Sequence, residues 1–146
     1  MIQKYYMRSF FIYLMLIGFL FSCKPKQLNQ KVNKQREGLW IENYGQDSSN
    51  YKSIGSYRNG EPIKKWTYYL NGKLIKRENY SSSYCKTKNY FKNGKVESKG
   101  KTKTTTDGEQ THWFYNGKWK YYTEKGKLIL IRKYDNGEVV SEQEIE

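Results

Sequence analysis

The two cysteines are the side chains of this 146-residue chain best suited to covalent chemistry, because a thiolate is a strong nucleophile. Cys23 stands directly after the parts of a secretory signal peptide: the cations Lys4 and Arg8, the apolar run 10–21 and a serine. The apolar run is shorter than the roughly 20 residues that cross a bilayer. The sequence therefore predicts a cleaved leader over residues 1–22 and a mature chain that begins at Cys23.

The segment Leu20-Phe21-Ser22-Cys23 resembles the bacterial lipobox. In lipoproteins with this motif the cysteine thiol takes up a diacylglycerol, further acylation such as palmitate completes the anchor, and cleavage falls just before the cysteine. The resemblance implies lipid attachment at Cys23 and a place in the cell envelope, on a bacterial membrane. Lys24 stands where an aspartate would signal inner-membrane retention, which favours the outer membrane. An ordinary secretory leader and an uncleaved anchor are the alternatives.

Cys85 is the thiol that remains once Cys23 is acylated, so the mature chain could not form an intramolecular disulfide. Its position after Tyr84 and a run of serines favours a small packed residue over a reactive thiol. His112 is the one histidine that could activate it, and no motif joins the two.

Other signatures of enzyme chemistry are lacking from the sequence. We find no recognisable spacing of paired carboxylates, metal ligands or phosphate-binding glycines. Four C-terminal glutamates suit a solvated tail or an edge strand better than a metal site: Glu138, Glu142, Glu144 and Glu146. We therefore expect a non-enzymatic protein with no catalytic residue, no cofactor and no metal ion.

The chain is strongly basic, with 27 Lys and Arg against 14 Asp and Glu and a formal charge of +13. Loss of the leader removes Lys4 and Arg8 and lowers the charge by two, to +11. Basic surfaces attract anionic lipid, acidic polymers and nucleic acid. Because an exported protein rarely meets nucleic acid, we expect an acidic envelope component as partner, or a solvated surface without a dedicated partner.

Residues 23–36 are polar and basic without apolar periodicity, which predicts a flexible tether. Beyond them one pattern recurs five times: an aromatic residue, any residue, then Asn-Gly. The copies are Tyr57–Gly60, Tyr69–Gly72, Phe91–Gly94, Phe114–Gly117 and Tyr134–Gly137. Asn-Gly favours the positive φ angles of a type I′ turn, so we expect each copy to mark a hairpin between short, aromatic-rich strands.

The stretches Trp66–Ile75 and Trp119–Ile129, with Gly38-Leu39-Trp40 and Gly117-Lys118-Trp119, resemble the MORN-variant repeats of bacterial antitoxin-like and lipoprotein families. Their unit runs roughly Gly-x-Trp-x-Tyr-Tyr, a polar stretch, then Gly-Lys-Leu. Lys64-Lys65 departs from it, standing where a glycine would precede Trp66. The middle of the chain is degenerate, which leaves the number of units open.

The resemblance implies an all-β fold over residues 37–146: an elongated antiparallel meander of repeated β-hairpins with Trp and Tyr rings layered between units. Such sheets offer long binding surfaces. We expect a lipid-anchored, non-enzymatic module that contacts an envelope protein or a glycan. The resemblance also implies an alternative, an immunity or antitoxin-like protein that neutralises a toxin. An enzyme that uses Cys85 or the acidic residues is the least favoured hypothesis. The open ends of the sheet leave the oligomeric state undecided.

Overall fold

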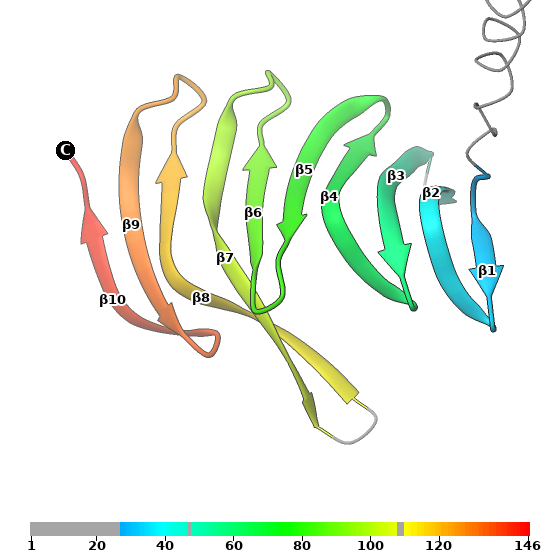
Figure 1. The fold of residues 1–146 in the computed structure, drawn as a ribbon. Helices are drawn as coiled ribbons and strands as arrows, with labels where there is room; N and C mark the ends of the chain where they lie inside the picture. Colours follow the sequence, from blue (N-terminus) through cyan, green and yellow to red (C-terminus); the bar gives the residue numbers. More distant parts are fainter. Residues whose placement is uncertain (1–26, 47, 108–109) are drawn as a thin grey trace, which may run out of the picture.

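The structure is a computed structural model that describes residues 27–46, 48–107 and 110–146, and this part of the chain forms one antiparallel sheet (Figure 1). The ten strands are β1 (Gln30–Val32), β2 (Gln35–Gln46), β3 (Ser49–Arg58), β4 (Glu61–Leu70), β5 (Lys73–Tyr80), β6 (Cys85–Tyr90), β7 (Val96–Asp107), β8 (Gln110–Tyr122), β9 (Leu128–Asp135) and β10 (Glu138–Glu144). Each strand pairs with the next along the chain, and the sheet is open at β1 and β10. The prediction of an all-β meander of hairpins is confirmed. Within the described ranges, no helix is long and apolar enough to cross a membrane.

The sheet begins earlier than the sequence indicated. Residues 30–36, which we expected in the tether, belong to the hairpin of β1 and β2. Its turn is formed by Asn33 and Lys34, both with positive φ. Asn-Lys therefore adopts here the turn conformation that we expected of Asn-Gly. The side chain of Asn29 extends this pairing, because it donates to the Ile41 carbonyl at 3.0 Å and accepts from the Ile41 amide at 2.7 Å. The N-terminal edge of the sheet is therefore hydrogen-bonded to β2 from residue 29 onward.

Three of the five Asn-Gly pairs form the expected hairpin turns. Asn59-Gly60, Asn71-Gly72 and Asn136-Gly137 have positive φ at both residues and join consecutive strands. Asn93-Gly94 also joins two strands, but only its glycine has positive φ, and the Gly94 amide donates to the Phe91 carbonyl at 2.9 Å. This loop is built on a different turn, in which the glycine supplies the single left-handed residue.

The prediction was wrong at Asn116-Gly117, which lies inside β8 and forms no hairpin. Lys99 pairs with Lys120 and Lys101 pairs with Asn116, so residues 117–119 bulge opposite the single residue Gly100. The bulge requires a residue with positive φ, and Gly117 supplies it, because β-bulges as well as turns can place a glycine in the left-handed region. The motif identifies a positive-φ position, and the strand pairing decides its use.

The same bulge recurs in β4, where residues 64–66 lie opposite Gly55. Lys64 has a φ of 59°, close to the 70° of Gly117 and the 74° of Gly38. The lysine that departs from the repeat pattern therefore adopts the backbone conformation of the glycine it replaces. Left-handed backbone costs a residue with a side chain about 1–2 kcal/mol.

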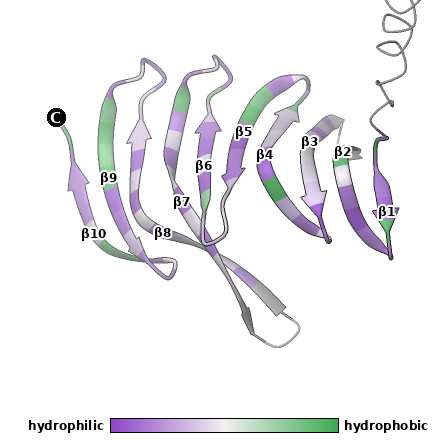
Figure 2. Ribbon diagram, in the orientation of Figure 1, coloured by the Kyte–Doolittle hydropathy of each residue, from purple (hydrophilic) through white to green (hydrophobic). Residues whose placement is uncertain are grey.

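The core of this single-layer sheet is small. Its buried apolar side chains are Trp66, Cys85, Trp119 and Tyr134. Figure 2 agrees, since most strands are largely purple or pale and only β9 has a long green segment. Trp66 and Trp119 follow the two bulges, and each indole packs against a glycine of the preceding strand, Gly55 or Gly100. Three of the four residues named as the apolar core are therefore aromatic, and such rings bury large areas.

Candidate binding surface

The predicted lipid-attachment residue, Cys23, lies outside the described residues. The predicted leader, 1–22, and the first part of the tether lie outside them as well. Lipid attachment at Cys23 and cleavage before it therefore stay predictions from the sequence.

Cys85 is a buried residue at the start of β6. Its sulfur lies 3.9 Å from the Thr87 hydroxyl, and its carbonyl accepts from the Thr102 hydroxyl at 3.5 Å. Burial, and after it the charge of Glu78, raises the pKa of the thiol above its usual value. A raised pKa and a buried sulfur both disfavour the thiolate that nucleophilic catalysis needs.

The sheet does not bring His112 to Cys85. Cys85 pairs with Thr102, and Thr102 pairs with Tyr115 on β8. His112 lies on β8 three residues from Tyr115, in the β7–β8 hairpin that extends beyond the other strands (Figure 1). A separation of two strands and three residues corresponds to roughly 14 Å between the Cα atoms.

Most of the C-terminal glutamates lie in the edge strand β10. Glu138, Glu142 and Glu144 belong to it, and the Glu142 carboxylate forms a salt bridge with Arg132 of β9. Among the residues that the structure describes, no three His, Cys, Asp or Glu side chains gather as metal ligands.

One face of the sheet carries the aromatic core, where two tyrosines meet a buried glutamate. Glu78 is 3% exposed, and its carboxylate accepts hydrogen bonds from Tyr68 at 2.6 Å and Tyr80 at 3.0 Å. The ammonium of Lys76 lies 3.0 Å from the other carboxylate oxygen. Burial, followed by the interactions with Glu78, raises the pKa of both tyrosines. The hydrogen-bonding capacity and the charge of these groups are therefore satisfied by one another within the sheet.

The second copy of the Gly-x-Trp pattern, on β8 and β9, lacks this cluster. Two tyrosines contact each other directly there instead. Tyr121 and Tyr134 lie 2.8 Å apart, oxygen to oxygen. Arg132 stands at the register position opposite Trp119 that Glu78 occupies opposite Trp66. The rings of the aromatic face pack on one another, as the layered Trp and Tyr rings implied by the repeat resemblance would.

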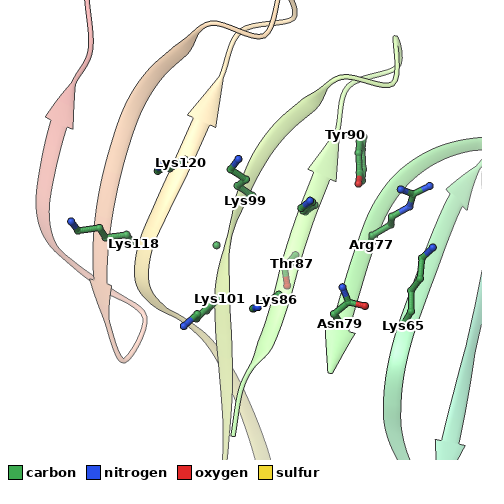
Figure 3. A pocket seen from close by; sticks show the side chains of 12 residues that line it. Lys65, Arg77, Asn79, Lys86, Thr87, Tyr90, Lys99, Lys101, Lys118 and Lys120 are labelled. Atoms are coloured by element: carbon green, nitrogen blue, oxygen red, sulfur yellow. The ribbon is translucent and has the colours of Figure 1, made fainter. Parts of the chain in front are cut away.

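The opposite face carries a groove of about 560 Å³ that crosses β4 to β8 (Figure 3). Eight of its lining residues are basic and none is acidic. We call this the basic groove; its cations are Lys65, Arg77, Lys86, Lys88, Lys99, Lys101, Lys118 and Lys120. Because side chains alternate between the faces of a strand, these residues point away from their buried neighbours such as Trp66, Thr87 and Trp119.

The register arranges most of these cations in two rows. Residues that pair directly form the first row, Lys65, Asn79, Lys86 and Lys101, and the second row, Arg77, Lys88, Lys99 and Lys120. Thr87 and Gly100 lie between the rows, with the Thr87 side chain buried on the aromatic face. None of the salt bridges between described residues includes a cation of the groove. The positive charges of the groove therefore face solvent without an acidic partner among those residues.

Composition and repeat motifs do not single out the groove residues, although the sequence carries a signal for them. Lys86-Thr87-Lys88, Lys99-Gly100-Lys101 and Lys118-Trp119-Lys120 each place two lysines around one small or aromatic residue. In a strand, residues two apart share a face, so this spacing indicates basic rows. The spacing alone does not show that the three segments lie on neighbouring strands.

Comparison with protein-family models, with curated proteins and with solved structures finds no match to this chain.

Proposed function

We propose that this protein is a lipid-anchored, non-enzymatic binding module of the bacterial cell envelope, which contacts an envelope protein or a glycan through its β-repeat sheet. Lipid on Cys23 would hold the sheet at a membrane, with the outer membrane favoured by Lys24. The repeats would be of the MORN-variant type, as the Gly-x-Trp spacing implies.

One observation carries this proposal: the sheet has a core on one face and an open, chemically distinct groove on the other. The aromatic face uses its rings and its buried glutamate internally. The basic groove gathers eight cations from five strands, seven of them exposed and Lys99 partly exposed. Binding modules commonly present a wide, preformed surface of one charge, because such a surface attracts a partner of opposite charge and orients it.

The anchor is tested first, by intact-mass analysis of protein from the membrane fraction. The expected product is a chain that begins at Cys23 and carries the mass of its acyl groups. Cys23→Ser should abolish both the added mass and the membrane association. Cys85→Ser is the matched control, because it removes the other thiol and should leave the lipid in place. An unmodified, soluble wild-type chain would contradict the proposal.

The partner is sought next, by crosslinking in intact cells followed by mass spectrometry. An envelope protein or glycan captured by wild type, and lost in the unanchored Cys23→Ser variant, would support the binding role. Capture of a toxin whose activity is suppressed by this protein would instead favour the antitoxin-like alternative.

A further inference from the structure

We infer that the basic groove binds an acidic polysaccharide, a linear chain of sugars that carry carboxylate or phosphate groups, which lies across strands β4 to β8. This inference rests on the proposed binding function and names the ligand class and the surface. It is carried by the gathering of cations (Figure 3), by the two rows that the strand register forms, and by the tyrosines beside those rows.

In the absence of a ligand, the arrangement of these charges destabilises the folded protein. Lys86 pairs directly with Lys101, and Lys99 lies between Lys88 and Lys120 on its two neighbouring strands. Like charges directly opposite one another across a sheet are destabilising. No described acidic residue forms a salt bridge with any of them. A bound polyanion would relieve the repulsion and release its own counterions, which is a strong source of affinity for charged polymers.

The rows suit a linear polymer. Neighbouring strands lie about 4.8 Å apart, so Arg77, Lys88, Lys99 and Lys120 present one cation per strand along a line across the sheet. The second row runs parallel to the first at a distance of about 7 Å, two residues away along each strand. Thr87 and Gly100 leave a trough between the rows. A single polymer chain fits between two such rows and contacts both, whereas a flat bilayer would meet only the ends of the side chains.

Tyrosine rings stand beside the cations of both rows. The ammonium of Lys101 lies 4.5 Å from the ring centre of Tyr84, and that of Lys99 lies 5.1 Å from the ring centre of Tyr122. Tyr90, which lines the groove, has the guanidinium of Arg77 at 5.6 Å. A tyrosine offers a flat apolar face and a polar hydroxyl, which together complement the C–H face and the hydroxyl groups of a sugar. Cations and rings side by side therefore favour an acidic glycan over a bare inorganic anion.

The test measures binding of the full-length chain, in a non-ionic detergent, to polygalacturonate, with neutral dextran as the uncharged polymer. The groove variant combines Lys88→Gln, Lys99→Gln and Lys120→Gln. The control variant combines Lys73→Gln, Lys92→Gln and Lys127→Gln, three exposed lysines outside the groove, so both variants lose the same charge. We expect the groove variant to bind polygalacturonate about tenfold more weakly or worse, with a salt dependence reduced by about one power per lysine. The control variant should keep its affinity within about twofold.

The thermal unfolding of both variants without ligand checks the fold. The groove variant should unfold at the same temperature as wild type or above it, because like-charge repulsion is removed. Equal loss of binding in the two variants would overturn the inference, since the affinity would then belong to the net charge. Tighter binding to vesicles of anionic phospholipid, or to single-stranded thymidine oligonucleotide, would overturn it in favour of a membrane or of nucleic acid.

These outcomes are separable from those of the proposed function. Suppose that the chain is acylated and crosslinks to an envelope protein but does not bind polygalacturonate. This result would contradict the groove inference alone. A chain that binds polygalacturonate but carries no lipid would contradict the membrane anchor alone.

Discussion

The indole of Trp119 packs against Gly100 so closely that a Cβ atom on Gly100 would lie 2.3 Å from Cδ2 of the ring. Trp119 is fully buried, and its indole N–H donates to the Lys101 carbonyl at 2.9 Å. Trp66 and Gly55 repeat this relationship with a separation of 1.9 Å. At both glycines, a large ring of the next strand occupies the space that a side chain would need.

Gly100→Ala should therefore destabilise the protein by about 1–3 kcal/mol or more, because the added methyl group cannot fit without displacing the indole or the backbone. The measurement is the free energy of unfolding in denaturant. Gly45→Ala is the matched control, since Gly45 has an ordinary φ and its nearest neighbouring atom would lie 3.8 Å from the new Cβ. Equal stability of the two variants would show that the indole moves aside freely.

Lys64→Gly should stabilise the protein by about 0.5–1 kcal/mol. Relief of the left-handed backbone strain at Lys64 outweighs the greater freedom that glycine has in the unfolded chain. Lys65→Gly, one residue along in the same bulge, should have the opposite sign and cost about 0.5–1 kcal/mol, because Lys65 does not have positive φ and glycine there only adds freedom to the unfolded chain. Thermal unfolding of both variants, compared with wild type, checks the prediction. A loss of stability in Lys64→Gly would contradict it.

The thiol of Cys85 should react slowly with an aromatic disulfide reagent in the folded protein. Its burial and the nearby charge of Glu78 raise its pKa, so the thiolate is scarce. The measurement uses Cys23→Ser, in which Cys85 is the only cysteine, in buffer and in denaturant. We expect the rate to rise by about two orders of magnitude or more on unfolding, in line with protection by stable structure. Equal rates would show that Cys85 is accessible and activated.

The hydrogen bond from Tyr68 to Glu78 should make the fold sensitive to alkali. The folded state raises the pKa of Tyr68 above its ordinary value of 10.0, first through burial and then through Glu78. The folded state therefore binds the phenolic proton more tightly than the unfolded state does. This contribution to stability is complete below about pH 10 and is lost as the pH rises further.

The matching measurement is thermal unfolding of wild type and Tyr68→Phe at neutral pH and above pH 10. The variant should be less stable at neutral pH by about 1 kcal/mol, because Glu78 loses a donor, and should decline less steeply in alkali. Tyr44→Phe is the control, since its side chain is 57% exposed. If Tyr68→Phe and wild type decline in parallel, the proton on Tyr68 does not govern the alkaline transition.

Local sequence was sufficient for the class of fold. Asn-Gly at residues 59–60, 71–72 and 136–137 forms hairpin turns because positive φ at two consecutive residues is a property of the backbone at those positions. The same reasoning failed at Asn116-Gly117, where a bulge uses the glycine, and it missed Asn33-Lys34, where a lysine accepts positive φ. Both differences depend on which strands pair, and distant residues determine that pairing.

The alternation of residues along each strand was also present in the sequence. It separates Trp66 and Trp119 from the flanking lysines, since side chains two apart share a face. Only the tertiary structure brought Lys88, Lys99 and Lys120 into one row. These residues lie far apart along the chain, and cross-strand hydrogen bonding with one specific bulge sets their register. The sequence therefore determined which side chains are basic and which face each strand gives them, and the pairing of five strands decided that they form a groove.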